Sequence, residues 1–383
     1  MTLSSMLDTV GIEIESIALP REEIGDILAS FTPDIRRMFR IDRDASVEFR
    51  ASRISRDGRV FINSHTRAAR ELPIAGPNFT SGYEVTTVPL TIKEVEKAVW
   101  NFIPAIACRG DFVHERASLH VHIGYGYSIK ILKRITEVGL KVEPLFYRLA
   151  GMGRSYRGER NSSIYARPLN NGPTVRGDDG YYYRIFNPES AIKSKTVTEF
   201  FSHYGIDPGG GDVQRYHPGR YFALNLYSLL LHGTLEFRYS NQTLRPLLAL
   251  GMIKFYRAFA ETVMYCDNDF INKLPNLSTF QKYEDSVYEN MLGDMFIWMR
   301  ENGIESLPNN KECDVILQNL YDTPHHNLTE QNTLSHIYDS NPDFRLRSSY
   351  IRTGKFERVD KPQPAGNIDI HNIREFSIIG DQS

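Results

Sequence analysis

Four short segments alternate apolar and polar residues with a period of two, and this pattern constrains the fold more than any other feature of the sequence. Because successive side chains of a β-strand point to opposite faces, each segment predicts a strand with one apolar face. The other faces carry acids, imidazoles and one guanidinium. These polar residues are Glu13 and Glu15, then Glu84, then His120 and His122, and finally Glu236 and Arg238.

Two interpretations of the polar faces remain open from the pattern alone. A sheet with one face in water accounts for any single strand. It accounts poorly for the set, because like charges placed opposite one another on neighbouring strands repel. Three strands that offer Glu and one that offers two His instead predict a site that concentrates negative charge and therefore needs a cation. Carboxylate oxygens favour Mg²⁺ or Mn²⁺, and the imidazoles shift the preference towards Mn²⁺.

The order of the predicted elements favours an α+β fold with a mainly antiparallel sheet, since short strands prevail early and long helices later. Thr91, with Glu94 three residues further on, predicts a capping box for a helix that ends near Ala107. A further strand is predicted over 221–226. Further helices are predicted over 128–150, 245–265 and 283–301.

Composition excludes several classes of protein. The 45 Lys and Arg residues against 47 Asp and Glu residues give a formal charge of −2, so the chain lacks the basic excess of a stable nucleic-acid binder. Three cysteines are too few for a disulfide framework. No apolar stretch approaches the roughly 20 residues of a membrane span, and the first residues lack a signal-peptide pattern. We therefore expect a cytoplasmic protein with no membrane partner.

The middle of the chain, residues 151–219, is rich in Gly, Pro, Asn and Tyr and contains several closely spaced arginines. A loop region of this length is typical of a functional lid or of a disordered linker. Arginine binds phosphoryl and carboxylate oxygens with two hydrogen bonds at once, although a solvated face explains the cluster equally well. These arginines are Arg154, Arg157, Arg160, Arg167 and Arg176.

Six blocks of residues, in this order along the chain, resemble the amidoligase family. That family is a branch of the glutamine synthetase-like carboxylate–amine ligases and is often found in phages and their hosts. The resemblance covers roughly residues 8–265, with Asp44-Ala45-Ser46 in place of the usual Asp-Gly-Ser turn and with a long central insertion. The blocks are 11–15, 44–47, 82–86, 119–124, 220–226 and 233–238.

The resemblance implies a curved antiparallel sheet with the active site on its concave face and helices packed behind it. A catalytic domain would occupy residues 1–270, with 151–219 as a lid, and a helical extension with a polar tail would occupy 271–383. The implied ligands of Mg²⁺ (or Mn²⁺) are Glu13, Glu15, Glu84, His120 and Glu236. Residues implied to act on ATP or the reacting groups are Arg238, Arg220 and Glu236, with Arg160 near the nucleotide. His122 would lie near the nucleotide or act as a further metal ligand.

The implied activity is ATP-dependent formation of an amide or isopeptide bond through an acyl phosphate. The partners would be a carboxylate and an amine, from an amino acid, a peptide or a similar small metabolite, and a homo-oligomer is possible. If a phage encodes the protein, the compartment would be the host cytoplasm. Two alternatives remain open: a phosphotransferase that resembles the guanidino kinases, and a catalytically idle scaffold or binding protein.

Overall fold

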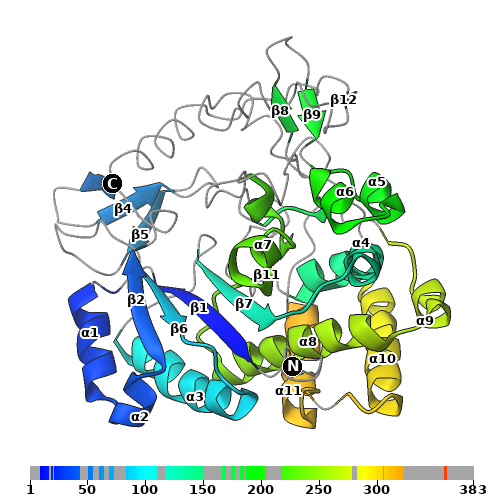
Figure 1. Ribbon diagram of the computed structural model, residues 1–383. Coiled ribbons are helices and arrows are strands. Elements are labelled where there is room, and N and C mark those ends of the chain that lie inside the picture. Colours follow the sequence, from blue (N-terminus) through cyan, green and yellow to red (C-terminus); the bar gives the residue numbers. More distant parts are fainter. Residues whose placement is uncertain are drawn as a thin grey trace.

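The centre of the molecule is a six-stranded antiparallel sheet with helices packed against it (Figure 1), which confirms the predicted α+β class. The strand order is β10-β11-β7-β1-β6-β2, so the first strand of the chain lies inside the sheet. The computed structural model describes residues 9–16, 19, 21–43, 51–54, 60–63, 69–72, 83–109, 117–149, 166–169, 174–176, 182–184, 186–203, 218–277, 283–304, 306–322 and 358–359. The turn at Asp44-Ala45-Ser46, most of 151–219 and most of the tail lie outside this part.

Four strands of the central sheet, β1, β6, β7 and β11, coincide with the segments of alternating polarity, whereas β2 was not predicted. Each pairs antiparallel with its neighbours, as successive strands of a mainly antiparallel sheet do. The strands are β1 (Val10–Ser16), β2 (Phe39–Arg43), β6 (Tyr83–Thr87), β7 (Ser118–Gly124), β10 (Leu224–Asn225) and β11 (Thr234–Asn241).

Two small three-stranded sheets accompany the central one. In the second of them, the C-terminal strand β12 pairs with β9 of the central insertion, so segments far apart in the sequence lie side by side. The first sheet consists of β3 (Ala51–Ile54), β4 (Val60–Asn63) and β5 (Ala69–Leu72). The second consists of β8 (Thr174–Arg176), β9 (Tyr182–Arg184) and β12 (Arg358–Val359).

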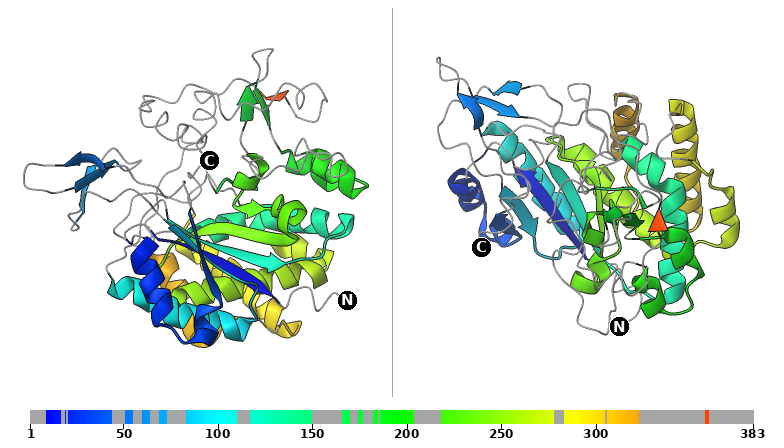
Figure 2. Two further views of the ribbon diagram at one scale, coloured as in Figure 1. Left: turned by 60° about the vertical axis from the view of Figure 1, so that its left-hand side comes forward. Right: turned by 90° about the horizontal axis from the view of Figure 1, so that it is seen from above.

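The long helices form a layer against the apolar face of the sheet, as the views in Figures 1 and 2 show. α8 packs against β7 and β11, and α3, α4 and α11 pack against α8. The helices of this part are α3 (Ile92–Cys108), α4 (Ile129–Leu149), α8 (Pro246–Tyr265), α9 (Asn268–Lys273), α10 (Asp285–Glu301) and α11 (Asn310–Asp322). The other helices are α1 (Arg21–Ser30), α2 (Pro33–Arg36), α5 (Pro188–Lys193), α6 (Val197–Ser202) and α7 (Ser228–His232). Among the described helices, none combines the length and the apolar character that crossing a membrane requires.

The hydrophobic core lies between the sheet and these helices. Ile12 and Ile14 of β1 and Phe237 of β11 are all buried in it. The ring of Phe237 stacks on Tyr256 of α8 with the centroids 4.7 Å apart, a contact that adds to the energy of burial. Packing on this apolar face therefore fixes which residues of the same strands point to the opposite face.

Local signals predicted several element ends correctly. The capping box is present: the Thr91 hydroxyl accepts a hydrogen bond from the Glu94 backbone, and the Glu94 carboxylate accepts one from the Thr91 backbone at 2.9 Å. The strand predicted over 221–226 is wrong in extent. A 3₁₀ turn at Pro218–Tyr221 precedes it, Phe222 forms a parallel bridge with Arg167, and β10 begins only at Leu224.

The buried carboxylate of Glu143, on helix α4, holds residues 166–169 through hydrogen bonds. Both oxygens of Glu143 accept hydrogen bonds from the Leu169 backbone N–H, at 2.9 and 3.0 Å, and Oε1 also accepts one from the Tyr239 hydroxyl at 2.9 Å. Burial raises the pKa of Glu143 to about 8, against the opposing effect of these hydrogen bonds. A short segment within the central insertion is therefore anchored at an ionisable group in the core.

Candidate active site

The strand register brings the polar residues of β1, β7 and β11 onto one face of the sheet. Glu13 pairs with His120 across β1 and β7, and Glu236 pairs with His122 across β7 and β11. Directly opposed residues of antiparallel strands project to the same side, about 5 Å apart. Three strands that are distant in the sequence thus supply one cluster.

Three side chains of this cluster have the geometry of a cation site. Nδ1 of His120 lies 2.8 Å from Oε2 of Glu13 and 3.8 Å from Oε1 of Glu236. Ligand atoms of the three residues all lie within 4.8 Å of one another. Two carboxylates and one imidazole suit a divalent cation such as Mn²⁺ or Mg²⁺, so the residues present fit the predicted metal.

His122 lies beside this triad and differs from His120 in charge. Its Nε2 is 2.9 Å from Oε1 of Glu13, and its Nδ1 is 3.1 Å from the hydroxyl oxygen of Thr234. Burial alone would lower the pKa of His122, but the charges of Glu13 and Glu236 outweigh it and raise the pKa to about 9. At neutral pH, His122 is therefore an imidazolium.

His120 has the opposite character. Burial, followed by the positive charge of Arg238, lowers the pKa of His120 to about 4, even though Glu13 and Glu236 act in the other direction. The side chain is almost completely buried. At neutral pH, His120 is therefore an uncharged imidazole, the form that binds metals.

Glu236 is held by two neighbours, one for each oxygen. Nη1 of Arg238 donates to Oε1 at 2.5 Å, and Nδ2 of Asn225 donates to Oε2 at 2.5 Å. Burial opposes the ionisation of Glu236, but Arg238 and then His122 keep its pKa below the usual value. Arg238 is also buried, which lowers its pKa, but the charges of Glu236, Glu13 and Glu15 outweigh burial and raise the pKa.

Glu15 and Glu84 lie further along the same face. Oε2 of Glu15 accepts hydrogen bonds from both the backbone N–H and the hydroxyl of Ser118, each at 2.6 Å. Glu84 pairs with Glu15 across β1 and β6, and Asp42 of β2 pairs with Glu84 in turn. The acidic face therefore continues across β6 to β2, beyond the triad.

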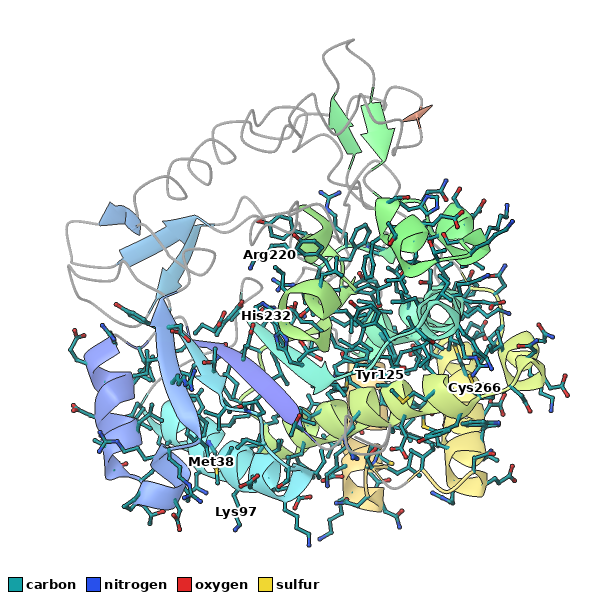
Figure 3. All side chains as sticks on the ribbon, viewed as in Figure 1. Met38, Lys97, Tyr125, Arg220, His232 and Cys266 are labelled. Atoms are coloured by element: carbon teal, nitrogen blue, oxygen red, sulfur yellow. The ribbon has the colours of Figure 1, made fainter. Side chains whose placement is uncertain are left out.

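Besides Arg238, the sequence predicted Arg220 and Arg160 as site residues, and the structure describes Arg220. Arg220 lies in the 3₁₀ turn before β10, with its guanidinium carbon 5.6 Å from the ring centroid of Tyr221 (Figure 3). Its charge contributes to lowering the pKa of His232, after burial and His122, so Arg220 acts electrostatically on this side of the site. Arg160 lies outside the described residues.

Some site residues were not predicted from the sequence. Asn225 contacts Glu236 because β10 pairs with β11, and Thr234 contacts His122 because β11 pairs with β7. The ring of His232, labelled in Figure 3 at the end of α7, packs edge-on against His122 with the centroids 6.4 Å apart. Ser118 could have been found, since period two places it on the same face as His120.

Comparison with known protein families gives a match over much of the chain. Residues 8–246 match the family described as "Putative amidoligase enzyme", which is more than half of the chain. No curated protein matches the sequence. The matched range contains every residue of the cluster described above.

Proposed function

Because the chain belongs to the amidoligase family, we propose that it is an ATP-dependent ligase that joins a carboxylate to an amine through an acyl phosphate. A carboxylate resists attack by an amine until it is activated. In the proposed reaction, a carboxylate oxygen attacks the γ-phosphorus of ATP and ADP leaves. The amine nitrogen then attacks the acyl carbon, phosphate departs with its bonding electron pair, and the amine loses one proton.

The observation that carries the proposal is the position of the cation triad beside a buried guanidinium. Glu13, His120 and Glu236 would hold Mg²⁺ or Mn²⁺, which would screen the charge of the ATP phosphates. The guanidinium of Arg238, which carries five N–H groups, donates from Nη1 to Oε1 of Glu236. We assign Arg238 to the phosphoryl oxygens, since planar paired donors suit phosphate geometry.

The residues around the triad are assigned four roles. Asn225 and Arg238 fix the two oxygens of Glu236, so that this carboxylate presents one orientation. His122, as an imidazolium, places a fixed positive charge next to Glu13, where we assign it to the nucleotide. Arg220 is assigned to the phosphate or acyl phosphate from the adjoining turn, and Glu15 and Glu84 complete the acidic face.

We further propose that the insertion 151–219 is the lid. Water competes with the amine for an acyl phosphate, so a ligase of this type needs a segment that closes over the site. Residues 166–169 are fastened to α4 through Glu143 and through the hydroxyl of Tyr147, which donates to the Ala166 carbonyl at 2.9 Å. These anchors support a fixed base for such a segment, on which Arg160 would reach the nucleotide.

The test uses hydroxylamine as a general amine. Purified full-length protein with ATP, Mg²⁺ and a panel of amino acids, peptides and cell-wall fragments should release ADP only when the correct acid is present, and should form its hydroxamate. Glu13→Gln and Arg238→Ala should abolish both products, whereas Glu22→Gln, an exposed acid on α1, should not. Full activity of either site variant would contradict the residue assignment.

Other outcomes would favour the alternative functions. A stable phosphorylated product that forms without any amine would indicate a phosphotransferase. Absence of Mg·ATP binding in calorimetry would indicate an idle scaffold.

A further inference from the structure

Ser118, the first residue of β7, forms hydrogen bonds with both Glu15 and His120, which do not form a hydrogen bond with each other. Its backbone N–H and its hydroxyl both contact Oε2 of Glu15 at 2.6 Å. The same hydroxyl oxygen lies 2.7 Å from Nε2 of His120. Nε2 of His120 is 3.8 Å from Oε1 of Glu15, too far for a direct hydrogen bond. Ser118 therefore bridges the two side chains.

The number of available protons decides the direction of these hydrogen bonds. A serine hydroxyl has one proton, and an ionised carboxylate only accepts. Oε2 of Glu15 therefore accepts a hydrogen bond from the Ser118 hydroxyl, whose oxygen in turn accepts a hydrogen bond from His120. The proton that His120 donates is on Nε2, since Nε2 is the ring nitrogen that faces Ser118.

An uncharged imidazole with its proton on Nε2 carries a lone pair on Nδ1. In this structure, Nδ1 points to Oε2 of Glu13 at 2.8 Å and lies 3.8 Å from Oε1 of Glu236. Three acceptor atoms then converge, which is unfavourable unless a cation or a proton lies among them. Ser118 thus favours the tautomer whose Nδ1 lone pair can bind a metal.

We infer that Glu15 and Ser118 act as a positioning relay, which holds His120 in the Nε2–H tautomer so that Nδ1 faces the cation. The inference rests on the cation site of the proposed function but not on the ligase reaction. It gives Glu15 a role through its Oε2 atom that differs from direct metal binding. All three members of the relay are buried, so water does not compete for these hydrogen bonds.

Groups that orient a metal-binding histidine typically contribute 10–100-fold to metal affinity. Replacement of Ser118 by Ala removes the acceptor for Nε2–H and the hydroxyl donor to Glu15. It leaves the backbone N–H of residue 118 and the ligand atoms of the triad in place. We therefore expect weaker cation binding from a substitution that replaces no ligand of the triad.

The experiment measures Mn²⁺ binding to the full chain, without ATP or substrates, from the electron paramagnetic resonance signal of free Mn²⁺. Ser118→Ala should bind Mn²⁺ about 10–100-fold more weakly than the wild type. Ser240→Ala is the matched control, because Ser240 is equally buried on the neighbouring strand and its hydroxyl bonds to Tyr256 at 2.8 Å, away from the triad. Thermal unfolding of both variants shows whether each is folded.

A second readout reports the tautomer directly. In ¹⁵N-histidine-labelled protein with Mg²⁺, the ring nitrogen shifts of His120, assigned by their loss in His120→Gln, should show a protonated Nε2 and an unprotonated Nδ1. Ser118→Ala should disturb this pattern. Glu15→Gln, which keeps an acceptor oxygen for Ser118, should lose less Mn²⁺ affinity than Glu13→Gln.

The outcomes separate this inference from the proposed function. Unchanged Mn²⁺ affinity in folded Ser118→Ala, or a proton on Nδ1 of His120 in the wild type, would overturn the relay. Absence of Mn²⁺ binding by the wild type would overturn the cation site together with the relay. Mn²⁺ binding that follows the expected pattern, in a protein that never forms a hydroxamate, would overturn the ligase proposal and support the relay.

Discussion

His120 and His122 contact opposite oxygens of one carboxylate. Nδ1 of His120 lies 2.8 Å from Oε2 of Glu13, and Nε2 of His122 lies 2.9 Å from Oε1. The two rings project from the same face of β7, yet at neutral pH one is uncharged and the other is an imidazolium. A single strand thus supplies both a neutral nitrogen ligand and a fixed positive charge, and Glu13 lies between them.

This arrangement makes Glu13 the residue whose change should affect cation binding most. Glu13→Gln removes the charge that both imidazoles face and one oxygen ligand of the triad. We expect Mn²⁺ affinity to fall by more than about 100-fold, the upper end of the loss caused by groups that only orient a ligand. The measurement is Mn²⁺ titration by electron paramagnetic resonance, with Glu22→Gln as the control. A loss of tenfold or less would mean that Glu13 is not a ligand.

Asn225 is the residue that we expect to control Glu236. Asn225→Ala leaves Oε2 of buried Glu236 without its amide donor and the backbone N–H of Ser228 without its acceptor. The expected cost is roughly 1–3 kcal/mol of unfolding free energy, together with weaker Mn²⁺ binding by about tenfold or more. Chemical denaturation and Mn²⁺ titration measure the two effects.

The control for Asn225 is Asn101→Ala. The amide of Asn101 also donates one hydrogen bond, to the Lys97 carbonyl at 2.7 Å, but it lies at the surface of α3. Its replacement should cost less than about 0.5 kcal/mol. Equal Mn²⁺ affinity in Asn225→Ala and the wild type would show that Glu236 does not need this amide.

The sequence predicts those parts of the fold that depend on local signals. Period two located the four strands of alternating polarity, and Thr91 with Glu94 located the start of α3. The helix α11 was not predicted, although Asn309 and Glu312 form a reciprocal cap at its start, with hydrogen bonds of 2.7 and 3.0 Å. That signal was available in the sequence.

Other features of the site depend on which strands become neighbours. The bond from Asn225 to Glu236 requires β10 to pair with β11, and the bond from Ser118 to Glu15 joins residues 103 positions apart. No local pattern encodes either contact. Period two assigns a residue to a face of its own strand, but only the register between strands determines which side chains touch.

A pH-dependent contribution to stability should arise at Glu143. Its folded pKa of about 8 is higher than the ordinary value for Glu, so between about pH 4.5 and 8 the folded state holds more protons than the unfolded state. This contribution to the unfolding free energy is therefore fully present below about pH 4.5 and is lost as the pH rises through 8.

Glu143→Gln tests this contribution, because glutamine cannot ionise. The difference in unfolding free energy between the wild type and the variant should shift in favour of the variant as the pH is raised from 5 to 8. Chemical denaturation at both pH values measures it, and a difference that stays constant with pH would contradict a raised pKa at Glu143.

The last prediction concerns the helices beyond residue 246, where the family match ends. Nζ of Lys254 on α8 lies 2.8 Å from Oε1 of buried Glu312 on α11 and 2.6 Å from Oε1 of half-exposed Glu96 on α3. Removal of one partner from a buried ion pair typically costs roughly 3–5 kcal/mol, because the other charge stays buried. Glu96 still faces Lys254, so we expect Glu312→Ala to lie near the lower end of that range.

Two further variants make this test specific. Glu96→Gln should cost less than about 1 kcal/mol, since Glu96 is partly solvated. The double change Lys254→Met and Glu312→Leu should restore part of the stability, because it leaves no buried charge, although the hydrogen bond from the Asn309 backbone to Glu312 is still lost. α8 packs directly against β7 and β11, which hold His120 and Glu236. If the ion pair fixes α11 on α8, Glu312→Ala should also weaken Mn²⁺ binding and the double variant should recover it. Unchanged Mn²⁺ affinity in a destabilised Glu312→Ala protein would show that α11 supports the fold without influence on the site.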